Sequence, residues 1–255
     1  DPPHSTLSIG GIFGGIAQGF RAPNLTDLTS QIDTGANEQE IPAISLEPEK
    51  YLTYEIGTRV NYQRFSAEIA GFYTDVNDMI NRFPTGLVTA DGKTEVGKAN
   101  VGDGFVTGIE YGMAYEIYPE WTLFGNATYM DGEMDVMTGP GPVASAEYLS
   151  RGMPLSGQVG LRWMSEQRRF WAQIRGVLSA TANHLSSRDR RDTERIPPGG
   201  TPGYERIDLK VGWNIHTNLT LTGAIDNMTN QNHRVHGSGT NAPGRNFIAA
   251  LESRF

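Results

Sequence analysis

Apolar and polar residues alternate one by one through several segments of this chain. Residues 51–62, "YLTYEIGTRVNY", show the pattern most clearly, and 204–215 and 107–117 repeat it. In a β-strand, successive side chains point to opposite faces, so each segment predicts a strand with one apolar and one polar face. In 51–62 the apolar face carries Leu52, Tyr54, Ile56 and Val60. The polar face carries Thr53, Glu55, Gly57, Arg59 and Asn61.

About ten segments have this character, each close to the length of a strand that crosses a bilayer. No apolar run approaches the roughly 18 residues that a membrane-spanning helix requires. The 31 glycines favour strands and bends over long helices. We therefore predict an all-β fold, an antiparallel transmembrane β-barrel segment of about ten strands. The predicted strands are 7–20, 49–61, 65–76, 104–118, 121–133, 155–166, 169–181, 204–215, 218–235 and 244–255.

The connections between these strands alternate between long and short. The layout of short periplasmic turns and long extracellular loops is typical of an outer-membrane barrel. The short connections are 62–64, 119–120, 167–168 and 216–217. The long connections are 21–48, 77–103, 134–154, 182–203 and 236–243.

Aromatic residues flank all four short turns. An outer-membrane barrel carries such a girdle where its wall meets the membrane interface. The alternative is that aromatic residues simply favour strands. The residues concerned are Tyr62, Phe65, Tyr115, Tyr118, Trp121, Trp163, Phe170, Trp171 and Trp213.

Composition excludes several classes of function. A net charge of −8 argues against a nucleic-acid partner. The absence of cysteine excludes disulfides and thiolate metal sites. No nucleophile elbow, phosphate loop or zinc signature is present. We therefore expect that the chain is not an enzyme and that it has no catalytic residue, no metal site and no cofactor.

Five motifs resemble the TonB-dependent outer-membrane receptors, and they occur in that family's order. They are "GFRAPNLTDL" (19–28), "LEPEKYLTYEIGTRV" (46–60), "FYTDVNDMI" (72–80), "GFVTGIEYGMAYEI" (104–117) and "LTGAIDNMTNQNHRVHGSGTNAPGRNFIAALESRF" (221–255). The sequence departs from the usual pattern at Met228, where leucine is common, and at His233, where tyrosine is common. In this family the barrel-assembly machinery reads a C-terminal strand that closes on phenylalanine, a role the resemblance gives to Phe255.

The resemblance implies a barrel of about 22 strands filled by an N-terminal plug domain. Ten strands alone would enclose a lumen only about 20 Å wide, too narrow for a plug. We therefore expect residues 1–255 to be one domain, the C-terminal part of a larger receptor barrel. The implied partners are the plug and remaining strands, the TonB energy-coupling complex, the barrel-assembly machinery, outer-membrane lipid and an extracellular chelate.

Charged residues on the polar faces are the first candidate site. The alternative is a solvated lumen wall, because barrel interiors are polar by default. Within the set, Glu55, Arg59 and Glu110 are our predicted plug-facing contacts. The whole set is Glu55, Arg59, Glu110, Glu116, Arg162, Arg206, Asp208, Lys210, Glu252 and Arg254.

The loop segment 186–200 is the second candidate, because it holds Arg188, Arg190, Arg191 and Arg195. Arginine presents forked donors that match carboxylates, so this loop is predicted to bind an anionic iron chelate. The alternative is a solvated loop whose charges pair with Asp189, Asp192 and Glu194.

These observations favour an outer-membrane receptor that imports a scarce nutrient, a ferric siderophore or similar chelate. Two alternatives stay open: a small self-closed passive pore, and a barrel hydrolase that uses Asp75, Asp78 and His184. His184, His233 and His236 also raise a haem or metal hypothesis, since imidazole ligates iron. On an extended chain, however, residues three apart face opposite ways.

Overall fold

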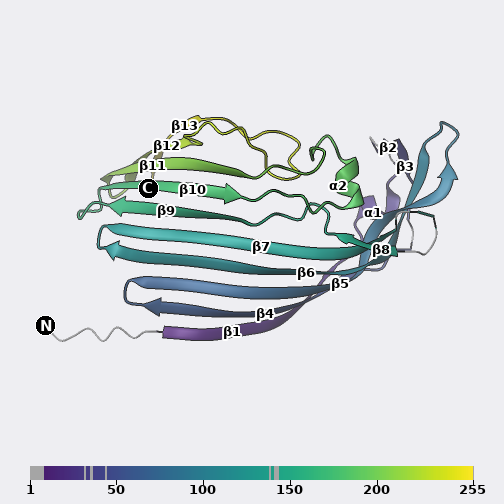
Figure 1. Cartoon of the computed structure of the whole chain (residues 1–255), viewed down its shortest axis with the longest axis horizontal. Coiled ribbons are helices and arrows are strands. Elements are labelled where there is room, and N and C mark those ends of the chain that lie inside the picture. Colours follow the sequence, from purple (N-terminus) through teal and green to yellow (C-terminus); the bar gives the residue numbers. More distant parts are fainter. Residues whose placement is uncertain are drawn as a thin grey trace.

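The computed structural model describes residues 9–31, 33–34, 37–43, 45–137, 139–140 and 144–254. Ten strands within these ranges run side by side, in chain order, each antiparallel to the next (Figure 1). They are β1 (Ile9–Arg21), β4 (Glu49–Tyr62), β5 (Phe65–Val88), β6 (Thr94–Tyr118), β7 (Trp121–Met137), β9 (Ser156–Met164), β10 (Phe170–Ser179), β11 (Tyr204–His216), β12 (Leu219–Asp226) and β13 (Asn246–Ser253).

Every predicted strand segment overlaps one of these ten strands, so the predicted all-β fold is confirmed. The four short turns join β4 to β5, β6 to β7, β9 to β10 and β11 to β12, close to the predicted positions. They lie together at the left end of Figure 1, and the long connections lie at the right end. Phe255, the predicted assembly signal, lies outside the described residues.

The strand registers give the sheet one apolar and one polar face. Residues opposite each other on neighbouring strands project to the same side. Ile56, Ile109 and Tyr129 share one row and are 67%, 51% and 45% exposed. Such exposure is a liability in water and is expected where hydrocarbon surrounds the sheet.

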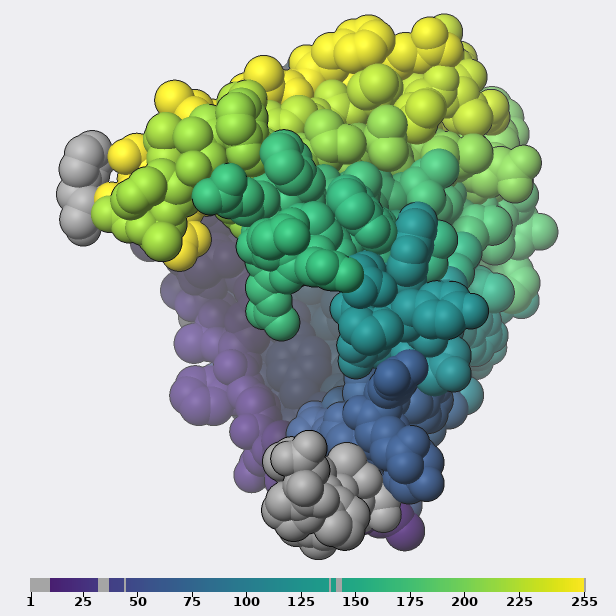
Figure 2. Space-filling model, turned by 90° about the vertical axis from the view of Figure 1, so that its left-hand side faces the viewer, coloured from purple at the N-terminus to yellow at the C-terminus, as the bar shows by residue number. Residues whose placement is uncertain are grey.

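The polar face lines the inside of the curved sheet, which we call the concave wall. A row of partners across β4 to β9 runs through Arg59, Glu68, Gly112, Asn126 and Gln158. A hollow of about 580 Å³ lies against this row. Figure 2, viewed from the end with the short turns, shows the strands curling around an open interior.

Aromatic side chains cover glycines on the concave wall. Phe13, Phe72, Phe124 and Trp171 each lie directly opposite a glycine of the neighbouring strand: Gly57, Gly108, Gly160 and Gly212. A Cβ at any of these four glycines would lie 2.2–2.6 Å from a ring atom of its partner. Each ring therefore occupies the space that a side chain would fill, as in aromatic rescue of strand glycines.

The position of Trp171 corrects one part of the predicted aromatic girdle. Trp171 lies on the concave wall over Gly212, where the Arg162 guanidinium stacks on its ring at 5.3 Å. Trp171 and Arg175 are four residues apart on β10, so period-two alternation places them on the same face. Trp213 and Phe170 do lie together on the apolar face, with stacked rings 5.8 Å apart.

The predicted loop 77–103 is mostly strand. β5 continues to Val88 and β6 begins at Thr94, so only a tight turn remains, closed by the Thr89 N–H donating to the Lys93 carbonyl at 2.8 Å. An antiparallel hairpin can extend beyond the membrane because its two strands satisfy each other's backbone groups. Bulges near Val76 and Met79 mark where the extension begins.

The predicted strand 218–235 is too long. β12 ends at Asp226, because Asn227 adopts a left-handed backbone conformation with φ of 53°. The Asn227 side-chain oxygen accepts from the Gln231 N–H at 2.8 Å, which closes a local turn. Asparagine tolerates this conformation and forms such turns readily.

Short strands and helices lie at the end of the sheet that carries the long connections. β8 (Ala144–Tyr148) pairs with β7, β2 (Asp33–Thr34) pairs with β3 (Glu38–Glu40), and β3 also adds to β6 in parallel. Two helices, α1 (Leu25–Thr29) and α2 (Ser187–Arg191), lie there as well (Figure 1). The buried apolar residues also gather toward this end, Val76, Ile80, Val96, Met134, Ala182, Leu185 and Ile196 among them.

The two outermost strands of the sheet are β1 and β13. No pairing joins them within the described residues. No helix of that part of the chain is long and apolar enough to cross a membrane.

Candidate functional site at the long-connection end

The concave wall carries the three residues predicted to face a plug. Glu55, Arg59 and Glu110 lie on it, because β4, β5 and β6 are in the register that the alternation requires. Arg59 donates to Glu68 at 2.6 Å, and both side chains are largely exposed. Their contact with a plug stays a prediction.

One acid of this wall is fully buried. Asp208 of β11 lies 3.0 Å from Arg175 and 3.6 Å from Arg206, and it accepts from the Asn227 N–H at 2.8 Å. Two hydrogen-bond donors and the Arg206 guanidinium therefore surround one carboxylate, which fixes the end of β12 against β10 and β11. A buried carboxylate requires such partners.

The first family-like motif meets the second at the end of β1. Arg21 of "GFRAPNLTDL" faces Glu49 of "LEPEK" and donates to both its carboxylate oxygens at 2.6 Å. It also contacts Asp27 of α1 at 2.8 Å. Asn24 caps that helix, since its side chain accepts from the Asp27 N–H at 2.9 Å. The motif therefore turns the chain and fastens it to β4.

A second group of charges attaches β3 to the extended hairpin. Glu40 of β3 is fully buried and contacts Lys98 and Arg82, each at 2.5 Å. Lys98 also lies 3.6 Å from Asp27. Glu40 therefore adds two buried ion pairs to the backbone pairing that joins β3 to β6.

Helix α2 is docked on the neighbouring loop. Its N-cap, Ser186, accepts from the Asp189 N–H at 3.1 Å. Asp189 is buried and accepts from the Ser150 hydroxyl at 2.8 Å and from the Arg151 N–H at 3.2 Å. The Ser187 N–H donates to Glu147 at 2.5 Å. These bonds fix a one-turn helix that is too short to be stable alone.

The four predicted ligand-binding arginines are in different environments. Arg195 pairs with Asp192 at 3.2 Å, as the self-paired alternative predicted. Burial raises the pKa of Asp192, but donors from Arg195 and Arg151 outweigh it and hold that pKa below its usual value. Arg191 lies 3.9 Å from Glu38 of β3. Arg188 and Arg190 have no carboxylate within salt-bridge distance among the described residues.

The histidines have other partners. The His184 ring stacks on Tyr148 at 4.7 Å and the His233 ring packs on Tyr204 at 4.4 Å. His236 shares a 2.9 Å hydrogen bond with Thr201, and burial lowers its pKa despite the nearby Asp189. No group of three or more metal-ligating side chains occurs in the described part of the chain.

The residues of the hydrolase alternative do not form a site. Asp78 pairs with Lys50 at 2.6 Å. Asp75 faces Leu52 and Phe105 across the strands, on the apolar side of the sheet. No hydrogen bond or ion pair joins either aspartate to His184 within the described ranges.

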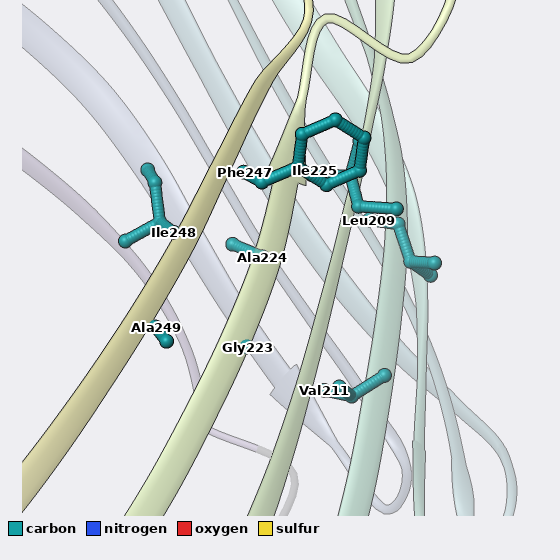
Figure 3. Close-up of a pocket in the computed structure, with 8 residues that line it drawn as sticks. All are labelled: Leu209, Val211, Gly223, Ala224, Ile225, Phe247, Ile248 and Ala249. Atoms are coloured by element: carbon teal, nitrogen blue, oxygen red, sulfur yellow. The ribbon is translucent and has the colours of Figure 1, made fainter.

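A shallow apolar notch of about 300 Å³ lies on β11 to β13. Figure 3 shows Leu209, Ile225 and Phe247 pointing to one side of the strands and Ile248 to the other. The notch arises where Gly223 and Ala249 leave space between larger neighbours. Its apolar lining suits contact with lipid, and no polar group in it offers chemistry.

Comparison with known proteins agrees with this architecture. The sequence model of the family described as "TonB dependent receptor-like, beta-barrel" matches residues 3–228. The chain belongs to the TonB-dependent receptor family. As a TonB-dependent receptor barrel it lies in the outer membrane, and its apolar face contacts lipid. The predicted family, fold and location are thereby confirmed.

Individual TonB-dependent receptors resemble the chain over almost its whole length. The iron-regulated outer membrane virulence protein of Vibrio cholerae is 25% identical over 260 residues, 95% of this chain and 37% of that protein. The copper transporter OprC superposes with a TM-score of 0.76 at 18% identity, over 98% of this chain and 38% of OprC. A mutant ferric enterobactin receptor of Pseudomonas aeruginosa gives 0.70 at 16% identity, over 96% and 38%. The chain spans less than two fifths of the length of each.

Several residues that organise this end were not predicted as site residues. Arg21, Glu49, Glu40 and Lys98 were not singled out, and neither was Arg151. Arg21 and Glu49 each lie in a quoted motif, so the motif order was the available signal. Glu40, Lys98 and Arg151 had no signal, because their partners are far away in the sequence.

Proposed function

We propose that this chain is part of an outer-membrane receptor that binds a ferric siderophore or similar metal chelate outside the cell and imports it. The observation that carries the proposal is the division of the sheet into an apolar outer face, a polar concave wall and one end built from long, ion-paired connections. Loops at a rigid barrel rim are well suited to ligand binding.

The likeness to receptors supports this class. The Vibrio cholerae relative is named for iron regulation, and two similar structures are named for copper and for ferric enterobactin. A shared fold at low sequence identity does not distinguish between these ligands. We propose an iron chelate because the Vibrio cholerae relative is named for iron regulation and because α2 carries arginines.

In this proposal the missing strands pair with β1 and β13, and a plug contacts Glu55, Arg59 and Glu110. The TonB complex supplies the energy for uptake, and the barrel-assembly machinery recognises Phe255. No covalent chemistry is required, so we propose no enzymatic activity and no cofactor. A self-closed pore would need β1 to pair with β13, and the described strands leave both of those edges open.

The test is iron uptake by cells that depend on the full-length receptor. We expect radioactive iron, supplied as a panel of ferric chelates, to enter cells that express it, and uptake to stop when the proton motive force is collapsed. If at least one chelate still enters the cells after the proton motive force is collapsed, that result would indicate a passive pore. Failure to take up any chelate would overturn the proposal.

A further inference from the structure

Two of the long connections meet at one buried histidine. His236 belongs to the β12–β13 connection, residues 227–245, and is only 8% exposed. Its Nδ1 atom shares a 2.9 Å hydrogen bond with the hydroxyl of Thr201, which belongs to the β10–β11 connection, residues 180–203. Thr201 is the only hydrogen-bond partner of the His236 ring in the part of the chain that the structure describes. This contact therefore joins two segments that β11 and β12 separate along the chain.

Thr201 is held in place by its own connection. Its N–H donates to the Ala182 carbonyl at 3.0 Å, and its carbonyl accepts from the Ala182 N–H at 2.9 Å. Gly200 precedes it with a φ of 111°, and a Cβ there would lie 2.1 Å from the Ala182 carbonyl oxygen. The base of the β10–β11 connection is thus tightly closed, so Thr201 offers His236 a fixed partner.

The residues after His236 pack closely on arginine side chains. Gly237 and Gly239 have φ values of 75° and 77°. A Cβ on Gly237 would lie 3.4 Å from the side chain of Arg151, in the 149–155 connection, and a Cβ on Gly239 would lie 3.3 Å from that of Arg195. Glycine tolerates positive φ and permits such close approach because it has no Cβ. The β12–β13 connection is therefore docked on two neighbouring connections.

The anions beside this contact already have other partners. Asp189 of α2 accepts from the Arg151 N–H and from the N–H of its own helix cap. Asp192 pairs with the guanidinium groups of Arg151 at 3.0 Å and of Arg195 at 3.2 Å. Among the described residues, no hydrogen bond or ion pair joins His236 to either aspartate.

The β12–β13 connection itself supplies no anion to His236. Its Arg234 donates to Asn241, and the ring of its other buried histidine, His233, packs on Tyr204. A protonated His236 ring would therefore be a buried cation whose hydrogen-bond partner is a neutral hydroxyl, which is an unfavourable arrangement.

The electrostatic surroundings of the His236 ring act in the same direction. Burial lowers the pKa of His236, and although Asp189 raises that pKa and Arg151 lowers it, the balance stays below the usual value. Burial disfavours the charged form of an imidazole because water no longer solvates the charge.

We propose that His236 is a pH-sensitive latch: its neutral ring holds the β12–β13 connection on the β10–β11 connection, and its protonation releases the connection and opens this part of the rim. In the released form the ring lies in water and titrates near its usual value of about 6.5. Docking favours the neutral ring, so the docking free energy is fully present above that pH and is lost as the pH falls below it. The latch goes beyond the proposed function and depends on no particular ligand.

The test is hydrogen–deuterium exchange of the full-length receptor in detergent micelles, without ligand, at about pH 7.5 and about pH 5. Mass spectrometry reads the peptides of residues 227–245, and each rate is corrected for the intrinsic exchange rate at that pH. His236→Gln is the decisive variant, because glutamine can hydrogen-bond Thr201 but does not titrate. His233→Gln is the matched control, because it removes the other buried histidine of the same connection.

We expect the corrected exchange rate of this connection in the wild-type receptor to rise on the order of tenfold between the higher and the lower pH, because exchange follows the population of the released form. His236→Gln should give the same corrected rate at both pH values, within about twofold. His233→Gln should respond to acid as the wild-type receptor does.

Three outcomes would overturn the inference. The first is equal protection of the wild-type connection at both pH values. The second is an acid response in His236→Gln as large as that of the wild-type receptor. The third is loss of the response in His233→Gln, which would assign the titration to the other histidine.

A second variant covers the case in which His236→Gln does not fold. Arg151→Gln removes a cation that disfavours protonation of His236, so its response to acid should be smaller than that of the wild-type receptor. An equal or larger response would contradict the latch. Because neither ligand nor transport enters these measurements, their failure leaves the proposed function intact.

Discussion

At the scale of single residues, burial separates the ion pairs of this chain into two kinds. Asp208 is inaccessible to water, accepts two hydrogen bonds and lies beside a second arginine. Arg59 and Glu68, by contrast, form one short contact that is exposed to water. Removing one partner from a buried group leaves an uncompensated charge, but exposed pairs are replaced by water at little cost. Distance alone does not distinguish these cases.

We therefore expect Asp208→Asn to destabilise the receptor by about 3–5 kcal/mol, because Arg175 and Arg206 lose their shared carboxylate. The measurement is urea unfolding of the full-length protein in detergent micelles, followed by tryptophan fluorescence. Glu68→Gln is the matched control and should leave the urea midpoint almost unchanged. Equal shifts for the two variants would contradict this assignment.

At the scale of elements, the four aromatic–glycine pairs explain how glycine-rich strands pack. Glycine weakens a strand because it has no side chain to pack. Here a ring from the neighbouring strand fills each gap, on the strand pairs β1–β4, β5–β6, β7–β9 and β10–β11. Other wall glycines are different, since a Cβ on Gly112 would meet nothing within 4 Å.

The difference between crowded and open wall glycines can be tested by adding one methyl group to a glycine of each kind. Gly160→Ala places a Cβ 2.4 Å from the Phe124 ring and 2.8 Å from the Ile174 carbonyl, so both must shift. We expect a loss of about 1–3 kcal/mol in unfolding free energy, as for other overpacked sites. Gly112→Ala, on the same wall, should have no measurable effect in the same unfolding assay. A stable Gly160→Ala variant would show that the ring moves freely.

At the scale of the whole molecule, the sheet is an open curved wall. β1 and β13 are its two margins, and apolar residues on them are strongly exposed, Ile12 by 83% and Phe247 by 71%. Open strand edges in hydrocarbon leave backbone groups without partners, at a cost of several kcal/mol each. We therefore propose that further strands complete the barrel.

The mass of the native polypeptide tests this proposal directly. We expect the protein extracted from the outer membrane to be about two to three times the 27.9 kDa of this chain, as a plugged barrel of about 22 strands requires. Mass spectrometry of the extracted protein gives the answer. A mass near 27.9 kDa would mean that ten strands suffice, and would favour the small pore.

Sequence alternation predicted most of the wall because each strand buries one face in lipid. The placement of Glu55, Arg59 and Glu110 on one side follows from period two alone. The same rule failed for 77–103 and 218–235. In the first, pairing continues beyond the lipid and needs no apolar face; in the second, Asn227 ends the strand through a local turn.

The sequence by itself determined the strands, the short turns, the family and the two faces of the sheet, since these depend on local pattern. Only the tertiary structure decided which charges meet. Arg21 and Glu49 are separated by 28 residues, and Arg82 and Glu40 by 42. Which charges meet depends on how distant segments pack against each other, and alternation along the sequence carries no information about that.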